Sequence, residues 1–245
     1  MNSIKINLSI ISHQQSHIIK DILDELSNNN NNIFNKIIIT INAKENFESL
    51  KEFKHLPIHF IVNEIPKGFG ENHNYAYKLH ECDYFAVINP DVKLKKINFL
   101  NLIKYFEFRD VHIVAPTAVD EKNNIQDNAR RFPSVLSPII RKLGIYNKNY
   151  YVDSEKYTYV DWLSGMFMII KSSVFEKIKG FDENYFMYYE DVDICRRIKM
   201  NGGKVMRINT EKIFHVGQRN SHKKVKYFLI HIKSMFYYHL KYIFK

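Results

Sequence analysis

The chain has 245 residues, of which 45% are hydrophobic and 14% aromatic, so it can build one sizeable core and is not disordered throughout. Its 36 Lys and Arg against 26 Asp and Glu give a net charge of +10, which favours a polyanionic partner such as nucleic acid, lipid headgroups or a phosphorylated ligand. Two distant cysteines, Cys82 and Cys195, and the absence of an uninterrupted apolar run of about 18 residues predict neither a disulfide framework, nor a structural zinc site, nor a membrane-spanning helix.

The amino-terminal part alternates short apolar runs with helical patterns. Runs rich in Ile, Val and Phe predict strands at residues 4–11, 36–41, 58–62, 84–88 and 111–115. Helical spacing appears over residues 18–26, after Gly70 and over residues 97–106, and an asparagine run at 28–32 predicts a loop. This alternation predicts an α/β fold with a mainly parallel sheet flanked by helices.

The second part of the chain is less regular. Residues 116–160 contain three prolines and little periodicity, so we expect an irregular excursion over the sheet. An apolar run at 165–170, a short helix near 172–178 and a helix that starts near Glu190 follow, the last ended by Gly202 and Gly203. We expect one domain over residues 1–221, with one half at 1–115 and a second half at 116–221.

A first candidate site follows the apolar strand at 84–88, which runs directly into Asn89, Pro90 and Asp91. Ligands of open α/β sheets bind beyond the carboxyl ends of the strands, where Asp91 would lie. A carboxylate there can hold a hard divalent cation that neutralises a diphosphate. The alternative is an ordinary turn, since Asn-Pro-Asp is common turn chemistry.

A second candidate site is the acidic pair Glu190 and Asp191, where an aromatic stretch gives way to a helix. Acidic residues at a helix start are often only dipole partners or caps. A carboxylate flanked by Tyr and Phe is also partly desolvated, however, and is then suited to take up a proton.

Two weaker signals complete the candidate site residues. His215 ends a short apolar segment, and a lone histidine is more often structural than a metal ligand. Gly68, Phe69 and Gly70, followed by Asn74, can bring the backbone close to a ligand, although the pattern is not a phosphate-binding loop of the Gly-x-x-x-x-Gly-Lys kind.

Five blocks in a fixed order make these signals specific: KGFGENHN, INPD, DWLSGMFMIIK, GFDENYFMYYEDVDICRR and IFHVGQRNSH. Together they resemble the family 2 glycosyltransferases, and within them the bacterial rhamnosyltransferase-like branch of O-antigen and capsule synthesis. The resemblance implies the GT-A fold, an inverting sugar transfer, and Mg²⁺ or Mn²⁺ as cofactor. It also implies a nucleotide-sugar donor, either dTDP-rhamnose or a UDP-sugar, and a saccharide acceptor linked to a lipid diphosphate.

The resemblance also assigns roles to residues. Asp91 takes the place of the last carboxylate of the Asp-x-Asp-like motif and holds the metal, with Asn89 in place of the first Asp. Asp191 takes the place of the general base beside Glu190, and His215 matches a position that completes the metal shell in some relatives. Trp162, Ser164 and Gly165 fall in the block that shapes the acceptor pocket, and Arg130 or Arg131 can hold an acceptor phosphate or form an ordinary surface pair.

The amino terminus departs from the family pattern. Thr-Tyr-Asn and Asp-Asn-x-Ser are usual after the first two strands, but this chain has Ser12-His13-Gln14 and Ile41-Asn42-Ala43. The acidic residue expected to recognise the pyrimidine base is therefore missing. Ser12 and Asn42 are the substitutes that we predict for donor binding.

The carboxyl-terminal stretch, residues 222–245, is basic and aromatic and predicts an amphipathic helix. One face collects apolar residues and the other most of the lysines: Val225, Leu229, Ile232, Phe236, Leu240 and Ile243 against Lys226, Lys233, Lys241 and Lys245. This pattern fits a helix lying on an anionic membrane surface, or a terminal helix packed on the domain with its lysines in solvent. Since residues 1–12 lack the features of a signal peptide, we expect a cytoplasmic protein on the inner face of the cell membrane.

Two rival functions fit parts of the sequence. The positive charge and many aromatic residues suggest a nucleic-acid-binding protein, but no RNA-recognition, zinc-finger or helix-turn-helix motif is present. The altered amino-terminal motifs suggest a non-catalytic relative that only binds sugar nucleotides. Retention of both carboxylate motifs together with His215 favours an enzyme, and we expect no nucleic-acid partner.

Overall fold

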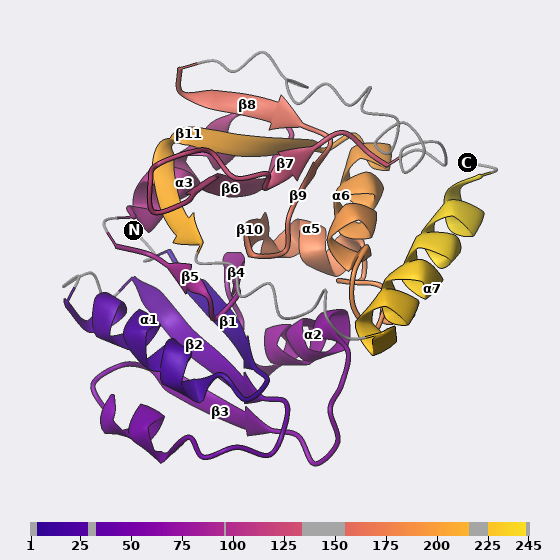
Figure 1. Ribbon diagram of the computed structural model, residues 1–245. Helices are drawn as coiled ribbons and strands as arrows, with labels where there is room; N and C mark the ends of the chain where they lie inside the picture. The colour runs from indigo at the N-terminus through magenta and orange to yellow at the C-terminus, as the bar shows by residue number, and fades with distance from the viewer. Residues whose placement is uncertain (1–3, 29–32, 96, 134–154, 216–224, 244–245) are drawn as a thin grey trace.

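The computed structural model describes residues 4–28, 33–95, 97–133, 155–215 and 225–243 (Figure 1). Within these residues a nine-stranded sheet forms the centre, in the order β3-β2-β1-β4-β10-β6-β11-β5, with β8 paired to β11. Its strands are β1 (Ile6–Ser12), β2 (Phe34–Ile41), β3 (Ile58–Val62), β4 (Tyr84–Ile88), β5 (Val92–Lys93), β6 (Val111–Val119), β8 (Tyr157–Val160), β10 (Phe167–Lys171) and β11 (Lys204–His215). A small separate sheet pairs β7 (Ala129–Arg130) with β9 (Trp162–Leu163).

Helices surround this sheet. They are α1 (Ser16–Asn28), α2 (Phe69–Leu79), α3 (Phe99–Lys104), α5 (Ser172–Lys177), α6 (Glu190–Met200) and α7 (Val225–Tyr242), with short 3₁₀ helices η1 (Glu48–Glu52) and η2 (Tyr105–Glu107). Helix α1 lies with strands β1 to β3, and α6 and α7 lie side by side at the other end of the molecule (Figure 1).

The amino-terminal half of the sheet is parallel. Strands β3, β2, β1 and β4 all run in one direction. In β1, Ile6, Leu8 and Ile10 are fully buried, and so are Asn7 and Ser9 between them. Both faces of this strand are therefore covered, which is why its sequence shows a nearly continuous apolar run rather than an alternation.

The second half of the sheet is mixed, and its pairing positions the functional loops. Strand β10 runs antiparallel to both β4 and β6, while β11 is parallel to β6. The register of β11 on β6 shifts between Ile208 and Lys212, and its last two residues, Phe214 and His215, also pair with β5. His215 thus becomes the partner of Val92, the residue directly after Asp91.

The expected α/β architecture is confirmed, and the strands at 58–62 and 84–88 have the predicted bounds. The prediction of an irregular stretch from residue 116 was wrong at both of its ends. Strand β6 continues through Pro116 to Val119, and residues 157–160 form β8. The sequence pattern also missed most of β11, because the polar residues at 209–212 divide it into two short apolar pieces. The asparagines at 29–32 and residues 134–154 of the predicted excursion lie outside the described residues.

Helix α7 packs on α6 by its polar face, with Ser234, Tyr238 and Tyr242 buried. The predicted apolar stripe instead faces solvent: Val225, Leu229, Phe236, Leu240 and Ile243 are each 58% to 75% exposed. The expectation that Lys241 stands on a solvated lysine face was wrong, because its ammonium group lies between two carboxylates of the domain. No helix in the described part of the chain combines the length and apolarity needed to cross a membrane.

Candidate active site

Asp91 and His215 meet at the edge of the sheet, as the motif order predicted. A carboxylate oxygen of Asp91, Oδ2, lies 3.3 Å from His215 Nε2, and the two side chains are 17% and 19% exposed. The other oxygen, Oδ1, is buried without a hydrogen-bond partner. A buried carboxylate oxygen with no donor is an unusual feature, and it fits a bound cation.

Gln126 orients His215. The Nδ1 atom of the histidine lies 2.8 Å from Gln126 Oε1, and Gln126 Nε2 donates to the backbone carbonyl of His215 at 3.0 Å. A ring nitrogen held in this way leaves Nε2 directed toward Asp91, which is how proteins commonly orient a metal-binding histidine. Sequence reasoning missed Gln126, because it lies in a stretch without periodicity or motif.

A divalent cation here would have few protein ligands. No group of three or more His, Cys, Asp or Glu side chains that could hold a metal occurs in the described part of the chain. Asp91 and His215 would therefore supply two ligands, and oxygens of a bound diphosphate and water would supply the rest. Mg²⁺ and Mn²⁺ sites on substrate phosphates are commonly built this way.

Two backbone hydrogen bonds connect the Asp91 edge to the second carboxylate motif. The N–H of Asn89, at the end of β4, donates to the carbonyl of Met166 at 2.9 Å. The adjacent Gly165 donates its N–H to Asp191 Oδ2 at 3.1 Å. Asp91 and Asp191, a hundred positions apart in the sequence, thus flank one short stretch of backbone before β10.

Burial raises the pKa of both members of the acidic pair. For Glu190, 6% exposed, burial comes first and the charge of Asp191 adds to it, which places its pKa well above the ordinary range. For Asp191, burial raises the pKa, while hydrogen bonds from Gly165 and Val192 and the charge of Arg130 oppose the rise. The oxygen Glu190 Oε2 has no hydrogen-bond partner. Desolvated carboxylates of this kind are better proton acceptors than exposed ones.

The turn before this pair has an uncommon backbone conformation. Tyr188 and Tyr189 both have positive φ angles, of 70° and 69°. Non-glycine residues in the left-handed region cost roughly 1–3 kcal/mol each and persist where the surroundings hold them. Such outliers gather at functional sites, and here they deliver Glu190 and Asp191 into the site.

The predicted acceptor residues gather around the same carboxylate. Trp162 donates its indole N–H to the carbonyl of Arg131 at 2.9 Å, and the Arg130 guanidinium lies 5.6 Å from the Trp162 ring. Arg130 forms a 2.7 Å ion pair with Asp127, and its charge lowers the pKa of Asp191 against burial. Ser164, between β9 and Gly165, donates its backbone N–H to the Asn128 carbonyl. An aromatic ring and a guanidinium are therefore both available near Asp191.

Gly68 and Phe69 border the site from the start of α2. A Cβ added to Gly165 would lie 3.2 Å from the Phe69 ring and 3.6 Å from Asp191 Cβ. At Gly68 an added Cβ would lie 3.0 Å from the Phe186 carbonyl oxygen, which accepts the Phe69 N–H. Both glycines are needed because three segments of the chain converge here.

The structure gives three predicted donor-binding residues different roles. Ser12 is fully buried, and its hydroxyl accepts the Gln15 N–H. Asn42 holds the loop before α2 through the backbone of Lys67 and the side chain of Asn63. The amide of Asn74 binds the Phe181 backbone twice and the Glu183 side chain. These three groups are buried and hydrogen-bonded within the protein, and their contact with the donor stays a prediction.

A cavity of about 1030 Å³ lies away from these residues, lined among others by Lys5, Tyr84 and Lys171. Tyr84 begins β4 and Lys171 ends the antiparallel β10, so this cavity lies at the end of the strands opposite to Asn89. Ligands of α/β sheets bind at the carboxyl ends of parallel strands, so this cavity is not the candidate site.

Known proteins share this arrangement. Rhamnosyltransferase WbbL of Escherichia coli (strain K12) is 31% identical over 250 residues, which is 94% of this chain and 90% of that relative. The chain belongs to the rhamnosyltransferase-like family 2 glycosyltransferases. A family model described as the N-terminal domain of galactosyltransferase matches residues 146–223 of this family 2 member. An N-acetylglucosaminyl-diphospho-decaprenol L-rhamnosyltransferase of Mycobacterium tuberculosis is 28% identical over 63% of this chain and 53% of its own.

Solved glycosyltransferases have the same fold. GalNAc-T7, solved with UDP, GalNAc and Mn²⁺, superposes with a TM-score of 0.66 at 12% identity over 88% of this chain and 44% of its own. Mannosyltransferase PcManGT from Pyrobaculum calidifontis, with GDP-Man and Mn²⁺, superposes with a TM-score of 0.63 at 13% identity, over 88% and 58%. This family 2 chain thus spans about half of each of these solved proteins. The likeness confirms the GT-A fold.

Proposed function

We propose that this protein is an inverting glycosyltransferase of polysaccharide synthesis, with Asp191 as general base. The observation that carries the proposal is the convergence of two carboxylate motifs on the backbone before β10. Asn89, two residues before Asp91, donates its N–H to the Met166 carbonyl. Asp191 accepts the N–H of the adjacent Gly165. A leaving group and an attacking hydroxyl need such adjacent sites for in-line displacement at one carbon atom.

The reaction is a single displacement at the anomeric carbon of the donor. An oxygen of Asp191 takes the proton of the acceptor hydroxyl as that hydroxyl oxygen bonds to the anomeric carbon. The bond from this carbon to the diphosphate breaks, and the nucleoside diphosphate leaves with the electron pair. A divalent cation held by Asp91 and His215 supplies charge neutralisation on the diphosphate when bound. Glu190 raises the basicity of its neighbour through its own charge when ionised.

The donor that we propose is dTDP-rhamnose, with UDP-sugars as the alternatives, since two similar proteins are named rhamnosyltransferases. The acceptor that we propose is a saccharide on a lipid diphosphate, because the Mycobacterium relative is named for such a substrate. Arg130, beside Trp162, offers a cation for the acceptor diphosphate and a ring for its sugar.

The deciding experiment is a transfer assay with the full chain, dTDP-rhamnose, Mn²⁺ or Mg²⁺, and N-acetylglucosaminyl-diphospho-polyprenol. We expect a product with one added rhamnose, inverted at its anomeric carbon, and no product after chelation of the metal. A parallel panel of UDP-sugars identifies another donor. Binding of sugar nucleotides without transfer from any donor would refute the enzyme and favour the binding-only alternative.

We further propose that the exposed face of α7 rests on an anionic membrane on the cytoplasmic side. Five apolar side chains of this face are largely in solvent, and the exposed Lys226 and Lys233 lie on the same helix. Burying apolar side chains in the interface while lysines contact anionic headgroups is the usual energetics of such helices. Membrane residence would bring the site to a lipid-linked acceptor.

Vesicle flotation tests this surface. We expect the full chain to float with vesicles containing anionic phospholipid, and the double variant Phe236→Glu/Leu240→Glu to stay in solution. Both side chains are exposed, so the change leaves the packing of α7 intact. The control is Leu100→Glu, an exposed apolar residue on α3. Equal flotation of parent and double variant would refute the membrane surface.

A further inference from the structure

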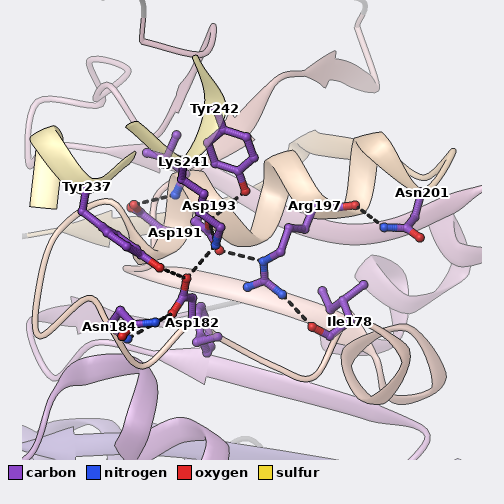
Figure 2. A network of polar contacts seen from close by, with 12 residues as sticks. Ile178, Asp182, Asn184, Asp191, Asp193, Arg197, Asn201, Tyr237, Lys241 and Tyr242 are labelled. Atoms are coloured by element: carbon purple, nitrogen blue, oxygen red, sulfur yellow. Dashed lines mark hydrogen bonds and ion pairs between the residues drawn. The ribbon is translucent and has the colours of Figure 1, made fainter. Parts of the chain in front are cut away.

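On its inward face, α7 carries Lys241, whose side chain contacts two carboxylates of the domain (Figure 2). Lys241 Nζ lies 2.6 Å from Asp182 Oδ2 and 2.6 Å from Asp193 Oδ1. The neighbouring tyrosines donate to the same two groups, Tyr242 to Asp193 at 2.8 Å and Tyr237 to Asp182 at 3.1 Å. One helix thus joins the loop before α6 to the first turn of α6.

Within this cluster, Lys241 completes a charge balance. Asp193 is fully buried, and its second oxygen accepts from Arg197 Nε at 2.7 Å. Two carboxylates therefore face two cations, Lys241 and Arg197. Burial alone would lower the pKa of Lys241, but the hydrogen bonds to Asp182 and Asp193 outweigh burial and raise it. Removing one partner of such a buried cluster leaves an uncompensated charge, which is far more costly than removing an exposed ion pair.

The cluster adjoins Asp191, the candidate base. Asp193 is two residues after Asp191 in the same turn of α6, and its charge contributes to the raised pKa of Glu190. The left-handed turn before Glu190 is also held by α7, since Ser234 Oγ donates to the Met187 carbonyl at 2.8 Å. The ring of Tyr189 packs against Tyr238 at 5.3 Å between centroids. Both sides of the segment that presents Asp191 are therefore anchored to the carboxyl-terminal helix.

We propose that Lys241 is a positioning residue for Asp191: by pairing with Asp193 it fixes the first turn of α6 and makes α7 a required part of the active site. This inference rests on the proposed glycosyltransferase function. Lys241 touches neither donor nor acceptor in this account, and acts only through Asp193. The charged or titratable groups that act on Asp193 include Lys241, Tyr242, Arg197, Tyr185, Tyr237, Tyr238 and Glu190, and those that act on Asp191 include Arg130 and Cys195.

The test compares Lys241→Met with Lys104→Met, an exposed lysine of α3 used as control, in the full chain. We expect Lys241→Met to lower kcat by about 10- to 100-fold, as small displacements of a catalytic group do, with the KM for dTDP-rhamnose changed by less than about twofold. The acid limb of the pH profile of kcat/KM should move to higher pH, because the cluster of Asp182, Asp193 and Arg197 keeps one unbalanced negative charge, which disfavours ionisation of the acidic pair. Lys241→Arg should recover part of kcat, and Lys104→Met should match the parent.

A second variant keeps the proposal testable if Lys241→Met does not fold. Tyr242→Phe removes one donor to Asp193 while keeping the ring, so the acid limb should move in the same direction by less. The role of Lys241 would be overturned if the acid limb of the kcat/KM pH profile stayed in place in the folded variants. It would also be overturned if activity fell only in proportion to the unfolded fraction. Absence of transfer by the parent chain would instead refute the proposed function, so the two failures are distinguishable.

Discussion

The two carboxylate sites of this protein differ in what surrounds them. Asp91 faces one histidine and leaves its second oxygen buried without a partner. Asp191 accepts two backbone N–H groups, yet burial and the neighbouring Glu190 keep the acidic pair hard to ionise. The first environment suits a bound cation, whereas the second favours uptake of a proton. The two tasks that we propose for these carboxylates therefore follow from the difference between their neighbours.

Asp191→Asn should have the largest effect, because the amide cannot accept the proton of the acceptor. We expect kcat to fall by about 10²–10⁴-fold, while binding of the nucleoside diphosphate with Mn²⁺ is retained. Turnover assays and calorimetric titration with dTDP measure the two quantities. Substantial turnover by this variant would remove Asp191 from the role of base and end the contrast between the two sites.

Asp91→Ala should have the converse effect, since it removes the carboxylate that we assign to the cation. Saturating dTDP with Mn²⁺ should stabilise the parent by about 3 kcal/mol when the ligand is near 100 times its Kd, and should stabilise this variant far less. Thermal unfolding with and without Mn²⁺ reads the difference.

Gln126→Leu serves as a graded control for the same site. It leaves both proposed ligands in place and removes only the group that orients His215, so Mn²⁺ affinity should fall by about 10- to 100-fold.

Equal Mn²⁺-dependent stabilisation of Asp91→Ala and the parent would exclude Asp91 as a metal ligand.

Glu190→Gln should have the smallest effect of these variants. Unlike the others, it should make the protein more stable. Burial raises the pKa of Glu190 in the folded state, so ionising it opposes folding at neutral pH, and this cost disappears below the unfolded pKa near 4.3. The variant should raise the free energy of unfolding by about 1 kcal/mol near pH 7.5, with the gain shrinking as the pH falls toward 4. Urea unfolding at several pH values measures it.

The exposed Glu121→Gln is the control for this measurement and should show no such pH trend. A gain for Glu190→Gln that is independent of pH would contradict the assigned ionisation.

Much of the fold was predictable from short-range patterns. The strands at 58–62 and 84–88 were bounded correctly because apolar β-branched and aromatic runs end there in turn residues. Strand β11 was mostly missed, because polar residues interrupt its apolar pattern where its register on β6 shifts, between Ile208 and Lys212. The division into 1–221 and 222–245, and the two halves at 115, stay predictions.

By itself the sequence determined the fold class and the family, and it predicted the two carboxylates, since all of these depend on local patterns and on the order of the blocks along the chain. Only the tertiary structure decided which polar side chains were already occupied. Asn42 and Asn74 look like ligand contacts in the sequence, but their partners lie in other segments. It also decided that α7 turns its apolar face outward and Lys241 inward, because the buried carboxylates Asp182 and Asp193 come from distant segments and need a cation.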